Sequence, residues 1–248
     1  MSNRKIFYES KTKYNDILVT QENNIITLYS PPDTRQTAID VKNPTLPHLE
    51  YARNILPGLV LAEGPESILM LGLGGGAIPR MLANINSQFF IDIVEIDPEM
   101  AAVAEKYFHF KTTDRIRLFI NDAFQFLKKS KKTYDIIIMD AYIGNNLPKS
   151  LSSLDFFKEA DKHLSNKGVL IANLMTTDRP YYKKMLKKIN SAFSEIWLLH
   201  AETSSNAIAF AMNRKLFRMK IAYRAIWLKK NFPPNFELIK KISRIKKL

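Results

Sequence analysis

The chain contains no cysteine among its 248 residues, which excludes disulfides, thiolate zinc sites and cysteine nucleophiles. Its four histidines are scattered and form no HExxH-type pair, so we expect no bound metal. No apolar run reaches the length of about 18 residues that a membrane span needs. The polar N-terminal sequence also lacks the features of a signal peptide. These absences predict a cytoplasmic protein with no transmembrane segment.

Acidic residues are scarce at the C-terminal end. Residues 214–248 contain twelve lysines and arginines but one acid, so this tail carries +11 of the net charge of +13. The remaining residues are nearly neutral, with 25 bases and 23 acids. The basic isoelectric point of the chain therefore results from the bases of the tail. It does not indicate that the whole chain binds nucleic acid.

The tail is expected to form two helices separated by Pro233-Pro234. Phe217, Ile221, Ala225 and Leu228 recur at helical spacing. This pattern favours one apolar face packed on the body of the protein and a solvated basic face. The alternative is that the tail contacts an acidic surface, such as a membrane, an RNA or a partner protein.

Glycine is sparse, with eight in the chain, yet Gly72, Gly74, Gly75 and Gly76 stand together. They lie between two apolar runs in the stretch 68–97, which reads as a β-loop-α-β unit typical of nucleotide binding. Such glycines let a ligand approach the backbone, and the next helix offers free N–H groups. Glu95 lies 95 − 76 = 19 residues past Gly76, near the spacing of about 20 for a carboxylate that holds ribose hydroxyls. The unit predicts an adenosine-type ligand; the alternative is a glycine-rich turn without one.

Strand and helix patterns alternate up to residue 213, which predicts an α/β fold with a mostly parallel, Rossmann-like sheet. The expected strands are 67–71, 90–96, 116–120, 134–140, 169–174, 195–200 and 207–212, and the expected helices are 48–61, 78–84, 98–107, 123–128, 154–164 and 181–193. Asp97 is the expected N-cap of one helix, and Asn166–Gly168 the C-terminal stop of another. Residues 1–45 read as a small β-rich section with a hairpin, ended by a proline-containing loop at 43–47.

Acidic residues follow three of the first four strands of this sheet. Glu95 and Asp97 follow the second, Asp122 the third and Asp140 the fourth, at the edge where open parallel sheets bind ligands. We expect Glu95 to hold ribose hydroxyls, Asp122 to accept from an adenine amine, and Asp140 to lie nearest the reacting end. The alternative for Asp122 and for Asp140, each taken alone, is that the side chain caps the start of the following helix.

The order of these motifs resembles the polyamine aminopropyltransferases, or spermidine synthases, and their wider class of spermidine-synthase-like proteins. The resemblance extends from about residue 7 to residue 212. It rests on YESKTKYNDILV, Arg35-Gln-Thr, LGLGGGAIPRML, VEIDP, NDAFQFL, YDIIIMDAY and GVLIANL. It implies a class I methyltransferase-type fold behind a small N-terminal β-domain. That matches a division into residues 1–45, a nucleotide-binding catalytic section 46–213 and a basic helical extension 214–248.

The resemblance also implies roles for individual residues. The donor, S-adenosylmethionine or its decarboxylated form, is expected to contact Gly72, Gly74, Gly75, Gly76, Glu95, Asp97, Asp122, Ala123, Asn15 and Gln36. Tyr14, Tyr51, Tyr142 and Ile143 are expected around the acceptor. Asp140 is the expected catalytic residue, the proton acceptor for an attacking amine. The resemblance implies no metal, and it implies a homodimer because the family commonly forms dimers.

Four positions depart from the family pattern. Gly75 stands where the family has an acid, and Ile143 stands where it has a second aspartate. Tyr51 aligns with a histidine and Asn15 with a glutamine. We infer that the nucleotide site is kept and the polyamine site is altered. Loss of the acid at Gly75 removes a repulsion against the carboxylate of S-adenosylmethionine, which favours methyl transfer to an unidentified acceptor, with an amine as one candidate.

Three alternatives stay open. The first is authentic aminopropyl transfer to putrescine or a related amine, with Asp33 or Asp40 supplying the missing charge. The second is an NAD-dependent oxidoreductase, since Gly72, Gly74 and Ala77 also fit the dinucleotide fingerprint. The third is a non-catalytic protein that binds a nucleotide as a scaffold or sensor, with the basic tail as its functional part.

Overall fold

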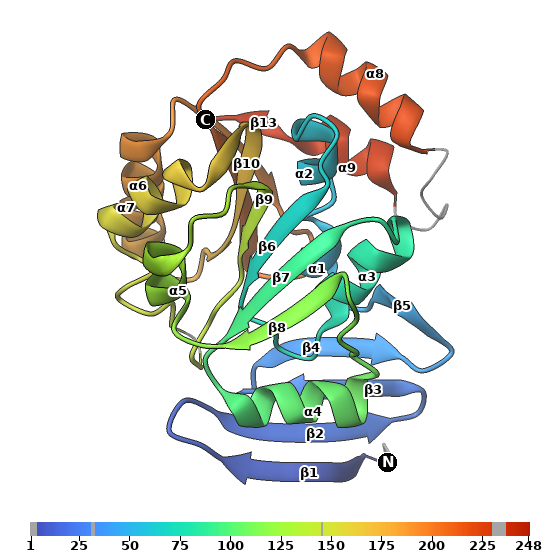
Figure 1. Ribbon diagram of the computed structural model, residues 1–248. Coiled ribbons are helices and arrows are strands. Elements are labelled where there is room, and N and C mark those ends of the chain that lie inside the picture. The colour runs from blue at the N-terminus through green and yellow to red at the C-terminus, as the bar shows by residue number, and fades with distance from the viewer. Residues whose placement is uncertain (1–3, 31–32, 145, 230–236) are drawn as a thin grey trace.

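The computed structural model describes residues 4–30, 33–144, 146–229 and 237–248. They form a small antiparallel sheet and a larger mixed sheet that carries the helices (Figure 1). The small sheet consists of β1 (Lys5–Lys11), β2 (Asp16–Glu22), β3 (Ile25–Tyr29), β4 (Arg35–Asp40) and β5 (Asn43–Pro47), paired in chain order.

The large sheet has the order β13-β11-β12-β10-β9-β6-β7-β8. Its strands are β6 (Ser67–Leu71), β7 (Phe90–Glu95), β8 (Ile116–Ile120), β9 (Tyr134–Met139), β10 (Leu164–Met175), β11 (Glu195–His200), β12 (Asn206–Met212) and β13 (Lys246–Lys247). The five strands from β10 to β8 are parallel, and β12, β11 and β13 extend the sheet antiparallel. The expected α/β fold with a mostly parallel sheet is therefore confirmed.

Helices cover both faces of this sheet, as apolar strands such as β9 require. Helices α1 (Glu50–Arg53), α2 (Pro57–Leu61), α3 (Ala77–Ile85), α8 (Arg218–Lys229) and α9 (Leu238–Arg244) share a core with Ile68 and Met70 of β6. Helices α5 (Ala123–Lys129), α6 (Leu154–Lys162) and α7 (Arg179–Ala192) share the opposite core with Leu69 and Leu71. Figure 1 shows these two groups of helices on opposite sides of the sheet.

The small sheet packs against α4 (Pro98–Phe108), which lies beside it in Figure 1. Val103 and Phe108 of α4 are buried with Ile17 and Val19 of β2 in a core of their own. This contact holds the small sheet over the edge of the large sheet where the carboxyl ends of the parallel strands lie. Both sheets can therefore contribute residues to one site.

Two sequence expectations near this junction were wrong. Residues 48–61 form the two short helices α1 and α2, because Pro57 has no N–H to donate and cannot continue a helix from α1. Residues 43–47 form the edge strand β5 and not a loop, since Pro47 lies in register with Ile39 of β4. Proline is tolerated on such an edge because one side of the strand makes no ladder hydrogen bonds.

Two further expectations failed towards the C-terminus. Residues 166–168 do not stop a helix: α6 ends at Lys162, and β10 has already begun at Leu164, which pairs with Tyr134. In the tail, Ile221 and Ala225 are buried as expected, but Phe217 precedes α8 and is 62% exposed. Pro233-Pro234 lies outside the described residues. Among the residues that are described, no helix is long and apolar enough to cross a membrane.

Candidate active site

The loop between β6 and α3 needs glycine for steric reasons. Gly72 has φ +94°, and a β-carbon there would overlap the carbonyl oxygen of Asp140. Gly76 has φ +70° as the N-cap of α3, and a β-carbon would lie 2.8 Å from Phe110. Larger residues are excluded at both positions, so the end of β9 and the loop after β6 lie in close contact.

Gly75 faces the small sheet. Its N–H donates to Thr37 Oγ1 of β4 at 2.9 Å. A β-carbon at Gly75 would lie 2.8 Å from Thr37 Cγ2 and 3.0 Å from the ring of Phe108. The resemblance places an acid of the family at this position. Here Thr37 of β4 and Phe108 of α4 leave no room for a side chain at Gly75.

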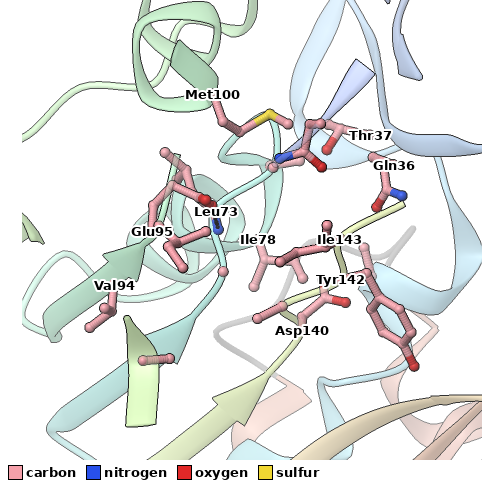
Figure 2. Close-up of a pocket in the computed structure, with 18 of the residues that line it drawn as sticks. Gln36, Thr37, Leu73, Ile78, Val94, Glu95, Met100, Asp140, Tyr142 and Ile143 are labelled. Carbon is pink, nitrogen blue, oxygen red and sulfur yellow. Dashed lines mark hydrogen bonds between the residues drawn. The ribbon is translucent and has the colours of Figure 1, made fainter. Parts of the chain in front are cut away.

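Glu95, at the end of β7, organises the glycine loop. Its carboxylate accepts hydrogen bonds from the backbone N–H of Leu73 at 2.9 Å and of Asp97 at 3.0 Å. Burial raises its pKa, while these hydrogen bonds lower it. Figure 2 shows Glu95 beside Leu73 at the wall of a pocket. A carboxylate held in this way keeps lone pairs for further donors such as sugar hydroxyls.

We call this cavity the glycine-loop pocket; about 1040 Å³ of space, including its mouth, lies between its walls. Of the sequence-predicted site residues, its lining contains Asn15, Gln36, Tyr51, Gly72, Gly74, Glu95, Asp122, Ala123, Asp140, Tyr142 and Ile143. Both sheets contribute to it, and Figure 2 shows Gln36 and Thr37 of β4 facing the same space as Asp140 and Glu95. Among the described residues of its lining, the charged side chains are Glu95, Asp122 and Asp140, with no lysine, arginine or histidine.

Gly75, Gly76, Asp97 and Tyr14 lie outside this lining. Asp97 caps α4 through the N–H of Glu99 and also accepts from Thr12 at 2.7 Å and from Asn15 at 3.1 Å. It therefore joins the small sheet to the large one. Tyr14 is half-buried in the β1–β2 turn, under the ammonium of Lys13.

Asp122 serves as a helix cap and lines the pocket as well. Its Oδ1 accepts from the N–H of Gln125 at 2.9 Å, which fixes the start of α5. Because this bond uses one oxygen, the second is available to the pocket. The two interpretations of Asp122 from the sequence are therefore compatible.

Asp140 lies directly after β9 and accepts a hydrogen bond of 2.8 Å from the side-chain amide of Asn173. Burial raises the pKa of Asp140 to about 7, and the hydrogen-bonding groups around it lower the pKa by a smaller amount. The Asn173 amide is the main one of these groups. The Tyr51 hydroxyl also lies beside the carboxyl, but its proton is donated to the Gln36 carbonyl at 2.8 Å. A carboxyl with a pKa near neutrality is suited to accept and release a proton.

A second cavity, the outer pocket, adjoins the first at Asp140. Gln36, Leu49, Tyr51, Asp140 and Tyr142 line both. The outer pocket encloses about 1400 Å³ including its mouth. Its remaining lining is mainly polar and comprises Asp33, Thr34, Arg35, His48, Glu50, Arg53, Gly144, Asn173, Met175, Thr177 and Thr203 to Asn206. Asp140 thus lies between the two cavities and lines both.

Asp33 and Asp40 differ in their relation to these cavities. Asp33 lines the outer pocket. Asp40 ends β4 away from both and accepts from the N–H of Lys42 at 2.9 Å. In the part of the chain that the structure describes, no three histidine or acidic side chains gather as metal ligands.

Sequence reasoning missed several residues of the site. Asn173 holds Asp140, and its Oδ1 in turn accepts from Asn206 at 2.9 Å. The Tyr142 hydroxyl donates to the Asn173 carbonyl at 2.9 Å. One signal was present, because Asn173 is the only polar residue in the apolar run Val169–Leu174. Asn206 and Thr203 follow a different strand and carried no such signal.

A family model supplies the decisive comparison. The model described as "Spermine/spermidine synthase domain" matches residues 54–220. The chain belongs to this family. The match covers the glycine loop, Glu95, Asp122, Asp140 and Asn173, and it ends before α9.

Relatives and solved structures agree with the family assignment. The polyamine aminopropyltransferase of Vibrio vulnificus is 33% identical over 183 residues, which cover 71% of this chain and 61% of that protein. The human eEF1A lysine and N-terminal methyltransferase is 27% identical over 180 residues, 65% of this chain and 26% of that one. A probable spermidine synthase from Corynebacterium glutamicum shares the fold, with a TM-score of 0.75 at 18% identity over 91% of this chain and 93% of that one.

These relatives are transferases, and the fold is the one that the sequence predicted. The chain spans 61% of the length of the Vibrio protein. The likeness to the Corynebacterium structure, at 18% identity, shows the fold alone.

Proposed function

We propose that this protein is a transferase that moves an alkyl group from an adenosyl sulfonium donor to an amine, with Asp140 as the proton acceptor. The observation that supports this proposal most strongly is the position of Asp140 at the boundary between the glycine-loop pocket and the outer pocket. A donor in the first pocket and an acceptor in the second would meet at this carboxyl. Both relatives named above carry amines in their descriptions: a polyamine, a lysine or an N-terminus.

The glycine-loop pocket fits an adenosyl group. We assign the ribose hydroxyls to Glu95, whose position is fixed by two backbone N–H groups. We assign the adenine amine to Asp122 and the neighbouring backbone at Ala123, both of which line the pocket. Gly72 and Gly74 keep the loop thin enough for close approach. The neutral side chains of Asn15 and Gln36 would lie near the other end of the donor.

The chemistry requires one proton to leave. A sulfonium supplies a carbon that a neutral amine can attack, with a thioether as the leaving group. An ammonium has no lone pair, so Asp140 would accept its proton before or during attack. Until Asp140 takes up this proton, its negative charge would also attract the cationic donor and the ammonium. The Asn173 amide holds the carboxylate in place for both tasks.

The decarboxylated donor, and hence aminopropyl transfer, fits the charge of the site best. The described charged residues of the glycine-loop pocket are three acids without a base. The carboxylate of S-adenosylmethionine would have no cation to pair with there, and an uncompensated charge is costly to bury. The decarboxylated form lacks this carboxylate but keeps the sulfonium and the ammonium, so its higher net positive charge suits acidic walls.

Methyl transfer from S-adenosylmethionine is the second candidate. The sequence favoured it because Gly75 replaces an acid of the family. In the structure, Ile143 lines the glycine-loop pocket, so the end of the donor would face apolar surface at this point. The similarity to the human lysine and N-terminal methyltransferase adds a second reason.

The acceptor site is proposed to be altered relative to ordinary spermidine synthesis. Ile143 cannot pair with an ammonium, whereas Asp33 lines the outer pocket and is a candidate partner for the far end of an amine. Asp40 is too remote for this role. The homodimer expected from the sequence stays a prediction, as do the cytoplasmic location and contacts of the basic tail with an acidic surface.

A binding titration tests the proposal. Purified protein is titrated by calorimetry with decarboxylated S-adenosylmethionine, S-adenosylmethionine and NAD. We expect the decarboxylated form to bind most tightly. Tightest binding of NAD would support the oxidoreductase alternative. Tight binding of a sulfonium without turnover across a panel of amines would support the non-catalytic alternative.

A further inference from the structure

The outer pocket has one wall made by an exposed loop. Residues 201–205 connect β11 to β12, and Thr203, Ser204 and Ser205 of this loop line the pocket. The loop leads directly into Asn206, which donates to Asn173, the residue that holds Asp140. The position of the loop therefore affects both the shape of the outer pocket and the support of the proposed base. Exposed loops with few apolar contacts are mobile unless specific bonds hold them.

Glu50 of α1 supplies such bonds. Its carboxylate accepts from the N–H of Glu202 at 2.8 Å, and from the N–H and the hydroxyl of Thr203, both at 2.7 Å. Burial raises the pKa of Glu50, but these hydrogen bonds outweigh it and bring the pKa down to about 2. Glu50 is therefore ionised at neutral pH, and it ties the loop to the helix that carries Tyr51.

The C-terminal helix α9 completes this arrangement. Arg244 lies 3.8 Å from Glu50 and 3.3 Å from Glu202, and its guanidinium also donates to the carbonyl of His200 at 2.8 Å. One side chain thus contacts α1, the loop and the end of β11. Through Arg244, Glu50 on the wall of the outer pocket is linked to Glu202 of the loop, although the two are about 150 residues apart in the sequence.

Lys241 attaches the same helix from its buried side. It is 2% exposed, and its ammonium donates to Asn54 Oδ1 at 2.6 Å. The Asn54 amide in turn donates to Glu50 at 3.3 Å. Two bases of α9 therefore converge on Glu50, one directly and one through Asn54. Part of the basic tail is thus engaged with the protein's own acids.

We propose that α9 is a brace for the acceptor side of the active site, with Arg244 as the positioning residue that fixes the loop 201–205 against Glu50. This proposal rests on the proposed function, because it takes the outer pocket as the acceptor site. It assigns a role to a segment that lies beyond the family match at 54–220. Without the brace, the loop loses its contact with Arg244 and keeps its hydrogen bonds to Glu50, so the loop opens more often, and acceptor binding weakens while the glycine-loop pocket keeps its shape.

The test compares Arg244→Gln with Lys240→Gln. Lys240 lies on the same helix, and its ion pair in the described structure is with Glu237 at 3.3 Å, away from the pocket. Amide hydrogen exchange, followed by mass spectrometry, is measured for peptides covering residues 201–206. We expect faster exchange in this segment for Arg244→Gln and unchanged exchange for Lys240→Gln. Glu202→Gln removes the acid that Arg244 contacts at 3.3 Å, at a half-exposed position. It should also speed exchange in residues 201–206, so it replaces Arg244→Gln in the test if that variant does not fold.

Kinetics give the second readout, with putrescine as the probe amine and decarboxylated S-adenosylmethionine as donor. We expect the KM for putrescine to rise about threefold or more in Arg244→Gln, a size consistent with a partly exposed ion pair. The Kd of the donor should stay within about twofold, and the melting temperature should match that of Lys240→Gln.

Unchanged exchange in both Arg244→Gln and Glu202→Gln would overturn the brace. Faster exchange with an unchanged KM for putrescine would overturn its link to the acceptor. If the wild-type protein gives no turnover with putrescine or with any other amine of a panel, the proposed function fails, and the exchange data still decide whether α9 holds the loop.

Discussion

Asn173 and Asp140 form a hydrogen bond of 2.8 Å between neighbouring parallel strands, from the amide of β10 to the carboxylate that follows β9. The bond favours the ionised form of Asp140 and opposes the larger effect of burial, which raises the pKa to about 7. Burial therefore dominates the pKa of the proposed base, and Asn173 tunes it without touching a reacting atom.

The first prediction follows from this bond. Asp140 accepts a proton only when ionised, so kcat/KM should rise with pH through a midpoint at about 7. Asn173→Ala removes the stabilising amide, and the midpoint of this rise should move to higher pH. The pH–rate profile measures it, with Asn213→Ala as a control because Asn213 contacts Asp161 and Ala192 far from the site. An unmoved midpoint would show that the amide does not tune Asp140.

The second prediction concerns Asp140→Asn, which keeps the shape but cannot accept a proton. Turnover should fall by about 100-fold or more, while donor binding is kept. Because the folded pKa lies above the unfolded value of about 3.9, ionisation of Asp140 destabilises the fold as pH rises from about 4 to about 7. Asp140→Asn should therefore melt no lower than the wild type at pH 8, and the difference should shrink towards pH 4. A lower melting temperature at pH 8 with near-normal turnover would instead indicate a structural role.

A third prediction tests the ribose assignment. Glu95→Gln retains the size of the side chain but loses the charge that would accept from two hydroxyls. Donor binding should weaken by about 1–3 kcal/mol, the range for removing a hydrogen bond to a charged group. Calorimetry with decarboxylated S-adenosylmethionine measures this, and Glu105→Gln on the exposed side of α4 serves as the control. Equal affinity of both variants would remove Glu95 from the donor site.

The fourth prediction uses a matched pair of glycines. Gly64 and Gly72 both have positive φ, +68° and +94°, but a β-carbon at Gly64 meets nothing within 4 Å whereas one at Gly72 overlaps the Asp140 backbone. Gly64→Ala should cost about 1–2 kcal/mol of stability from backbone strain. Gly72→Ala should cost more and also abolish donor binding, because the loop must move away from β9. Chemical denaturation and calorimetry check both, and equal behaviour of the pair would contradict the close contact.

The sequence predicted the glycine-loop unit well because every signal there is local. The strand at 67–71 matches β6, Asp97 caps α4, and Glu95 reaches the glycine loop. These features depend on residues close together in the chain, where periodicity and capping rules apply. In the small sheet the sequence predicted a β-rich section with one hairpin, and the edge strand β5 was hidden by its prolines.

The outer pocket was poorly predicted because its contacts are long-range. Glu50 meets the loop 201–205 across about 150 residues of sequence, and Lys241 reaches Asn54 across 187. No spacing rule connects such positions. The tail illustrates the same limit, since its charge suggested a solvated face or an acidic partner, and Arg244 in fact contacts Glu50 and Glu202 of its own chain.

Competition between the two donors decides whether Asp140 assists aminopropyl transfer. The protein is incubated with equal amounts of S-adenosylmethionine and decarboxylated S-adenosylmethionine and a panel of amines, and the nucleoside products are identified by mass spectrometry, in parallel with Asp140→Asn. We expect methylthioadenosine, the thioether left by aminopropyl transfer, together with an aminopropylated amine, and we expect both to be lost in Asp140→Asn. Adenosylhomocysteine instead of methylthioadenosine would establish the methyl-transfer candidate. Products that form equally well with Asp140→Asn, or neither thioether with any amine, would contradict the role given to Asp140.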